Sequence, residues 1–160
     1  NVLDDDNEES DICSQSNHIQ NIKLKKPIIS YKQIIKTDTA LFRSDLALAY
    51  QDFGYNASLI SKYYGFYESA SYTQNDGYTE IKYHLHKNDV VTIRVNNYEG
   101  YAMVKGIFKH KNNDGSYYPF VYVDWFEDTS RKHIKVNCPI FVLHQDTSRR
   151  RIFSLTNVDG

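Results

Sequence analysis

From residue 78 onward, apolar residues alternate with polar ones, as they do in half-buried β-strands. This alternation predicts strands over residues 78–85, 89–95, 101–110, 118–126 and 140–143, with a sixth strand or a closing turn over 151–155. Asn112-Asn113-Asp114-Gly115, between the third and fourth of these segments, is a strong turn signal. Five or six short strands joined by polar turns, with no helical pattern between them, predict a mainly β fold: an antiparallel sheet or a small barrel.

A helical pattern precedes the strands. Thr37-Asp38-Thr39 offers N-cap residues, apolar residues then recur at helical spacing, and Gly54 supplies a stop, which predicts a short helix over 39–53. The next segment, 55–75, is rich in Tyr, Ser and Asn and alternates poorly, so we expect irregular strand and loop there. We expect residues 37–86 to pack against the strands, because their apolar side chains would otherwise expose a large area.

Charge divides the chain into three parts. The first 20 residues carry six acidic residues and no Lys or Arg, whereas residues 21–36 carry five Lys and no acidic residue. The remainder is neutral. Few large apolar residues interrupt the acidic start, so the pattern predicts a solvated, disordered tail over 1–36 and a single domain over 37–160. The alternative is that the acidic arm folds back on the Lys stretch or meets a basic partner.

Composition limits the class of protein. A chain of 160 residues with 41% hydrophobic and 24% charged residues is not wholly disordered, and a net charge of −1 argues against a globally basic nucleic-acid binder. Cys13 and Cys138 are too few for a disulfide framework and fit a reducing compartment. Neither a membrane-spanning apolar run nor a signal-peptide pattern is visible. Because Met103 is the only Met and the chain starts with Asn1, we expect a fragment of a longer protein.

Chemical motifs are sparse. His84 and His86 point to one face of a strand and could begin a metal site, but the third ligand would have to come from elsewhere, so a polar surface is the favoured interpretation. No nucleophile, phosphate loop or dinucleotide fingerprint is visible, and we predict neither an enzyme nor a cofactor. Arg149, Arg150 and Arg151 form a dense basic run that could bind phosphates, or could lie in a solvated turn.

Three blocks in the last 74 residues form a recognisable pattern. The first block, 87–93, is an Asp followed by alternating apolar residues. The second pairs an aromatic strand, 101–108, with 120–126, which ends in Val-Asp-Trp-Phe. The third joins a strand and an acidic loop, 138–146, to a closing segment, 152–160. In these blocks the chain resembles the bromo-adjacent homology (BAH) domain of chromatin proteins. It departs from that family after Trp125-Phe126, where Glu127-Asp128-Thr129-Ser130 replaces a basic residue, Pro and acids.

The resemblance implies a small twisted β-barrel that binds a histone tail or another nuclear protein, in the nucleus. In some members an aromatic cage reads a methylated lysine, because cation–π and apolar contacts remain once the hydrogen-bond donors are methylated. Tyr101 and Trp125 match the two aromatics most often found in that cage; Glu127 or Asp128 could supply its acidic side, and Tyr98 could lend a further ring. The alternative for Tyr101 and Trp125 is that both rings pack in the barrel core.

A second resemblance, to BAH-like accessory segments of transposon-encoded proteins, implies a different class of function. It suggests a nucleic-acid-binding accessory domain of a mobile-element protein, acting through Lys23–Lys36 and Arg149–Arg151.

Overall fold

The computed structural model describes residues 19–28, 39–52, 54–55, 61, 63–75, 77–96, 98–144 and 149–159. Within them the chain is mainly β, with one α-helix, one short 3-10 helix and nine strands. The elements in chain order are β1 (Ile19–Ile28), α1 (Ala40–Gln51), β2 (Tyr64–Asn75), β3 (Glu80–His86), β4 (Val90–Val95), β5 (Tyr98–Lys111), β6 (Tyr117–Lys132), β7 (Pro139–His144), β8 (Ile152–Ser154), η2 (Leu155–Asn157) and β9 (Val158–Asp159).

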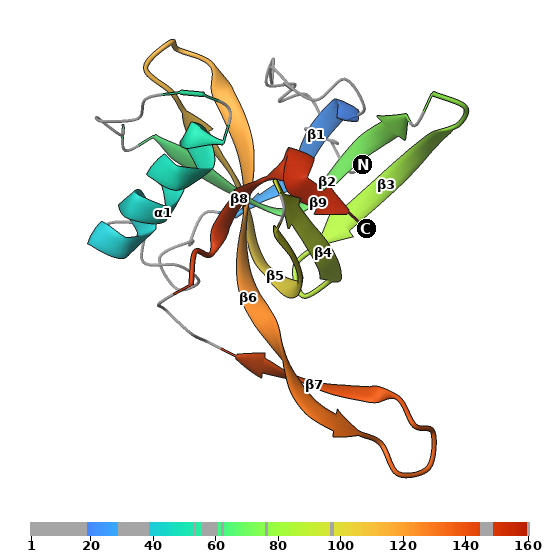
Figure 1. Cartoon of the computed structure of the whole chain (residues 1–160). Helices are drawn as coiled ribbons and strands as arrows, with labels where there is room; N and C mark the ends of the chain where they lie inside the picture. Colours follow the sequence, from blue (N-terminus) through green and yellow to red (C-terminus); the bar gives the residue numbers. More distant parts are fainter. Residues whose placement is uncertain are drawn as a thin grey trace.

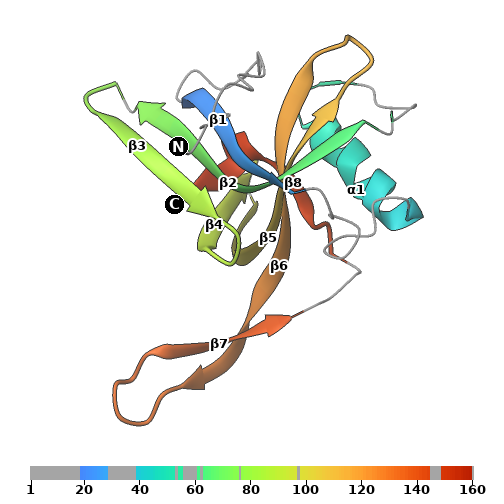
Figure 2. The ribbon, with the colours of Figure 1, turned by 180° about the vertical axis from the view of Figure 1, so that it is seen from behind.

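All strand pairs are antiparallel and belong to one curved sheet (Figures 1 and 2). The long hairpin of β5 and β6 is its centre: β5 also pairs with β2 and β4, and β6 also pairs with β7 and β8. Hydrogen bonding through Asn112 and Gly115 closes the hairpin turn, as the sequence predicts. The predicted antiparallel sheet is therefore confirmed, whereas the described strands do not close into a barrel.

Helix α1 covers one face of the sheet. Its N-cap is Thr39, whose Oγ1 accepts a hydrogen bond from the Phe42 N–H at 3.1 Å, and the chain leaves the helix through Gly54 at φ 79°. One helical face, with Phe42, Leu46, Ala49 and Tyr50, is buried against the aromatic residues of the sheet. The expected packing of the helix on the strands is therefore confirmed. No described helix has the length and apolar character needed to cross a bilayer.

The β5–β6 hairpin is buried on both faces, and each face belongs to a separate apolar cluster. On one face, Ala102, Val104, Val123 and Trp125 join residues of β1 to β4 and the C-terminal segment. On the other, Phe108, Tyr118 and Phe120 join α1. Two buried faces explain why aromatic residues follow one another so closely in this part of the sequence.

Two sequence predictions are wrong in the N-terminal half. Residues 19–28, predicted as part of a tail, form β1 and pair with β2. Ile22 and Leu24 are buried and alternate with Lys23 and Lys25, so a two-residue period lies inside the basic stretch and outweighs its charge. The rest of the predicted tail lies outside the described residues.

The second wrong prediction is the irregular segment at 55–75, because residues 64–75 form the twelve-residue strand β2. Phe66 packs in the cluster under α1, whereas its neighbour Tyr67 packs in the other cluster. Consecutive aromatic residues therefore serve opposite faces, which hides the alternation that a half-buried strand would show.

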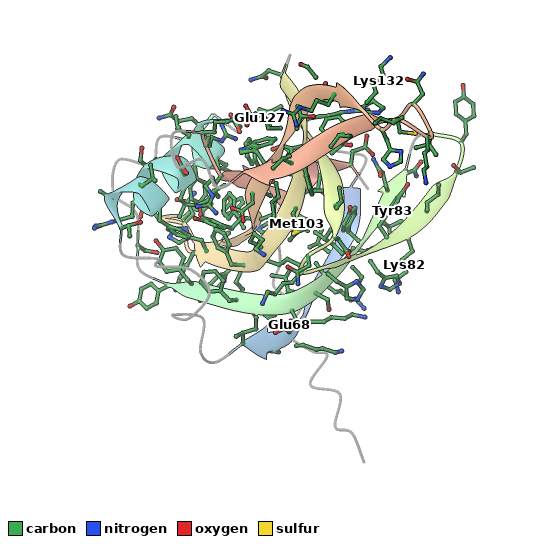
Figure 3. The ribbon with its side chains drawn as sticks, turned by 90° about the horizontal axis from the view of Figure 1, so that it is seen from below. Glu68, Lys82, Tyr83, Met103, Glu127 and Lys132 are labelled. Atoms are coloured by element: carbon green, nitrogen blue, oxygen red, sulfur yellow. The ribbon has the colours of Figure 1, made fainter. Side chains whose placement is uncertain are left out.

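Beyond the body, β6 and β7 continue as a twisted two-stranded arm (Figures 1 and 2). Among the described strands, the outer part of β6 pairs with β7 alone, down to Lys132 opposite Pro139. In Figure 3, Lys132 on this arm lies away from Met103, which belongs to the body.

Candidate functional site

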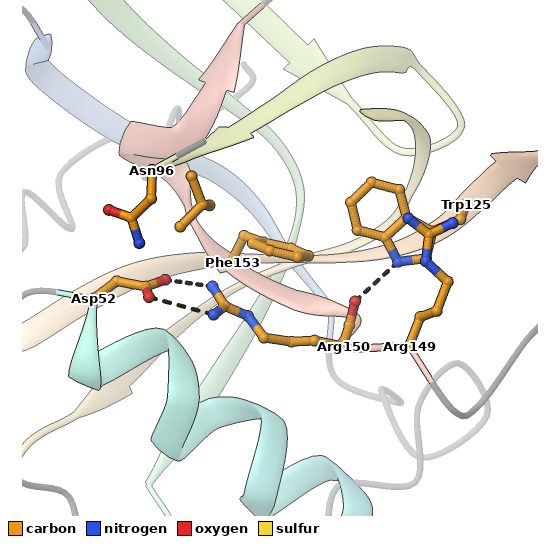
Figure 4. A pocket seen from close by; sticks show the side chains of 7 residues that line it. Asp52, Asn96, Trp125, Arg149, Arg150 and Phe153 are labelled. Carbon is orange, nitrogen blue, oxygen red and sulfur yellow. Dashed lines mark hydrogen bonds and ion pairs between the residues drawn. The ribbon is translucent and has the colours of Figure 1, made fainter. Parts of the chain in front are cut away.

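Trp125 is a structural residue. Its side chain is only 2% exposed and meets Phe153 edge to face at 5.4 Å between ring centroids. The indole Nε1–H donates to the Arg150 carbonyl oxygen at 2.9 Å (Figure 4). A Cβ on Gly100 would lie 2.7 Å from the indole ring, so this position of β5 has room for glycine only.

A cation of the same chain already lies over the face of the Trp125 ring. The guanidinium of Arg149 lies 4.3 Å from the indole centroid, beside a cavity of about 420 Å³ that Asp52, Arg150 and Phe153 also line (Figure 4). The Trp125 ring, which the family resemblance assigns to a methyl-lysine cage, therefore already makes a cation–π contact within the protein.

The other two arginines of the run are also engaged inside the protein. Arg150 lies 4.2 Å from the Phe153 centroid and forms an ion pair with Asp52. Arg151 lies 4.4 Å from the Tyr122 centroid, forms an ion pair with the buried Asp124, and donates from Nε to the Val123 carbonyl oxygen at 3.1 Å.

Helix α1 holds the same run from the other side. The Asp45 carboxylate accepts the Arg151 backbone N–H at 3.1 Å. Burial raises the pKa of Asp45, whereas the hydrogen bond from the Arg151 backbone and the charges of Arg150 and Arg151 oppose that rise. The predicted basic patch at Arg149–Arg151 is wrong, because at least two of its charges are neutralised by acids that lie far away in the sequence.

Tyr101 and Trp125 lie on opposite faces of the sheet. Ala102 pairs with Trp125, so the neighbouring Tyr101 points the other way. The cause is a bulge at Lys105: from His110–Tyr118 to Gly106–Tyr122 the pairs follow one register, and from Val104–Val123 onward they follow another. A continuous register would have placed both rings on one face. A cage that contains both is therefore wrong.

Tyr101 lies instead at an aromatic groove at the base of the arm. The groove has a volume of about 390 Å³ and is lined by Val90, Tyr101, Phe126 and Phe141, which come from β4, β5, β6 and β7. Tyr101 and Phe141 meet edge to face, with ring centroids 5.6 Å apart, and are 50% and 39% exposed. We call these four residues the aromatic groove.

Of the two predicted acids, Asp128 lies on the groove side of the arm. It pairs directly with Phe141 in the β6–β7 register, so the two side chains share a face, and its carboxylate accepts the Ser130 N–H at 2.8 Å. Glu127 pairs with Val142 on the opposite face of the arm. The side chain of Tyr98 lies outside the described residues.

His84 and His86 lie on the outer face of β3, as the alternation predicts, and the described residues contain no group of three or more metal-ligating side chains. On the same outer face, Lys23 of β1 and His84 of β3 flank the buried Ser71 of β2, and Lys25 and His86 flank Ser69. Lys32 and Lys36 lie outside the described residues.

Comparison of the sequence with protein-family models and with curated proteins finds no match. Sequence reasoning selected Tyr101 and Asp128 but missed Phe126 and Phe141. The alternation of 140–143 with a central aromatic was visible, yet only the strand register places Phe141 beside Tyr101.

Proposed function

We propose that this chain is a non-enzymatic protein-interaction module, BAH-like in its fold and setting, whose aromatic groove binds the lysine side chain of a histone tail. The observation that carries the proposal is the group of three partly exposed rings, Tyr101, Phe126 and Phe141, on one part of the sheet that no described helix covers, with Asp128 on the same face. Rings attract a cation through their faces, and a nearby carboxylate adds a complementary charge.

The groove favours a methylated lysine over an unmodified one. Its lining consists of apolar side chains, which offer few acceptors to the three N–H groups of an ordinary ammonium. Methyl groups remove those donors and add apolar surface, while the positive charge remains. The proposed partner is a histone tail in the nucleus. We also propose that the sheet forms a closed BAH-like barrel, and the curvature of the sheet around the larger apolar cluster supports this.

The test is a binding titration of the full chain with a panel of histone-tail peptides that carry lysine or trimethyl-lysine. Phe141→Ala and Tyr101→Ala are expected to weaken trimethyl-lysine binding by roughly 3- to 30-fold, the range of a cation–π contact. Tyr78→Ala is the matched control, because Tyr78 is 96% exposed on a different hairpin.

A peptide in which a neutral tert-butyl group replaces the trimethylammonium tells the charge from the shape. We expect it to bind more weakly than the charged peptide. If no peptide binds the wild-type chain, or if Phe141→Ala and Tyr78→Ala behave alike, the proposal is wrong.

A second candidate function, that of a nucleic-acid-binding accessory domain of a mobile-element protein, is favoured by one observation. Lys23 and Lys25 lie with Lys82 on the outer face of β1 to β3, near Ser71, whose hydroxyl is buried and has no hydrogen-bond partner among the described residues. DNA affinity that falls with salt, and falls further in K23A/K25A/K82A, would support this candidate; unchanged affinity in that variant would remove it.

A further inference from the structure

The arm has a surface that the proposed function does not use. Every residue from Ser130 to Pro139 is exposed, and the adjoining ends of β6 and β7 pair, among the described strands, only with each other. A two-stranded ribbon of this kind is only marginally stable by itself in water. The tip is nevertheless ordered by hydrogen bonds from the His133 N–H to the Cys138 carbonyl at 2.9 Å and from the Asn137 N–H to the His133 carbonyl at 2.8 Å.

Its charge is uniformly positive. Arg131, Lys132 and Lys135 lie on the outer arm, and the stretch 129–145 contains no Asp or Glu. None of the three forms an ion pair with any residue in the described part of the chain. They differ in this from Arg150 and Arg151, which are paired with Asp52 and Asp124.

Apolar side chains lie among these cations at the tip. Ile134 is 100% exposed and Val136 is 64% exposed. A fully exposed Ile at the end of a projecting basic ribbon has no apolar partner within the described structure, so folding alone does not explain its position.

We propose that the arm inserts into a groove of double-stranded DNA, with Arg131, Lys132 and Lys135 on phosphates and Ile134 against the base edges. Charge complementarity favours a polyanion. The shape favours DNA, because the major groove of B-DNA, about 12 Å wide, admits a two-stranded β-ribbon, whereas that of an RNA duplex is deep and narrow. Ile134 meets either a thymine methyl group or an unstacked base step.

This surface is separate from the aromatic groove. Glu127 and Asp128 stand at the base of the arm, where their charges repel phosphates, so the contact is confined to the part beyond Ser130. The arm proposal does not depend on methyl-lysine binding, and the two are tested with different ligands.

The experiment is a fluorescence-anisotropy titration of the full chain with a duplex DNA of about two helical turns, at several salt concentrations. Three phosphate contacts predict a slope of log affinity against log salt of about −2.7, which is a loss of roughly 40-fold between 50 and 200 mM. The variant R131A/K132A/K135A is expected to lose that slope and most of the affinity. The variant K23A/K25A/K82A removes the same charge from the other basic surface; the arm proposal expects it to keep both, whereas the second candidate function expects it to lose affinity.

Ile134→Ala separates insertion from simple charge attraction. It is expected to weaken DNA binding several-fold while the salt slope stays the same, because no phosphate contact is removed. A duplex RNA of equal length is expected to bind more weakly than the DNA.

Three results would overturn the proposal: no binding of wild-type protein to DNA, equal binding by the wild type and the arm variant, or RNA binding at least as tight as DNA binding. All substituted residues of the arm are exposed, and an unchanged melting temperature shows that the variant is folded.

Discussion

One face of the β5–β6 hairpin carries aromatic residues along its whole length, but only part of it is covered. Phe108 and Phe120 lie beneath α1 and are fully buried, whereas Tyr101 and Phe126 lie further along the same face, where no described helix covers them. The Arg151–Asp124 pair stands at the boundary between the two stretches. Both stretches carry aromatic residues, so residue type does not distinguish them. Whether α1 covers the rings decides if they stabilise the fold or remain available to a ligand.

The largest expected effect is the difference in folding stability between truncating a covered ring and truncating an uncovered one. Phe120→Ala removes a fully buried ring and is expected to lower the free energy of unfolding by about 3–5 kcal/mol. Phe141→Ala, on β7 beside the uncovered stretch, is expected to lower it by less than about 1 kcal/mol, because the ring is already partly in water. Urea denaturation of the two variants checks this, and equal losses would erase the distinction.

The next largest effect is expected at the Arg151–Asp124 ion pair, between the covered and the uncovered stretch. Arg151→Ala leaves the buried Asp124 carboxylate without its cation and is expected to cost about 3 kcal/mol of folding stability. The double variant R151A/D124N removes the uncompensated charge and is expected to recover part of that loss. If Arg151→Ala is as stable as the wild type in thermal denaturation, the ion pair does not hold the two stretches together.

The smallest effect concerns His110, a buried histidine in the covered region. The Ser61 carbonyl can only accept, so His110 donates to it from Nε2 at 2.8 Å, and its Nδ1 accepts from the Tyr50 hydroxyl at 2.6 Å. Burial lowers the pKa of His110, and the hydrogen bond to Ser61 only partly opposes that effect.

Below the ordinary His pKa, the His110 imidazole therefore binds a proton more readily in the unfolded state than in the folded state. The free energy of unfolding should fall as pH decreases below the ordinary His pKa of about 6.5, by at most about 1.4 kcal/mol per pH unit. His110→Gln should flatten this dependence. Denaturation midpoints measured between pH 5 and 8 would decide, and a pH dependence unaffected by His110→Gln would contradict the assignment.

The sequence predicts the strands whose polar and apolar residues alternate, and it does not predict β1 and β2. Alternation locates β3, β4 and the core of β5 and β6 to within a few residues, and the helix is anticipated from its cap. It fails at β2, where Phe66 and Tyr67 are buried on opposite faces, and at β1, where charge conceals the buried Ile22 and Leu24.

The candidate site is predictable only in part, for a geometric reason. A single-residue bulge at Lys105 moves Trp125 to the face opposite Tyr101, and no local signal in the sequence announces it. The partners of Arg150 and Arg151 are likewise invisible, because Asp52 lies about a hundred residues from Arg150 and Asp124 belongs to another strand.

The most direct test uses the fact that Trp125 is the only tryptophan, so its indole N–H gives a single NMR resonance. A ¹H–¹⁵N titration with a trimethyl-lysine histone-tail peptide is predicted to shift the backbone resonances of Val90, Tyr101, Phe126 and Phe141 and to leave the indole resonance in place. A large shift of the Trp125 indole resonance, with those of the aromatic groove unmoved, would contradict the account.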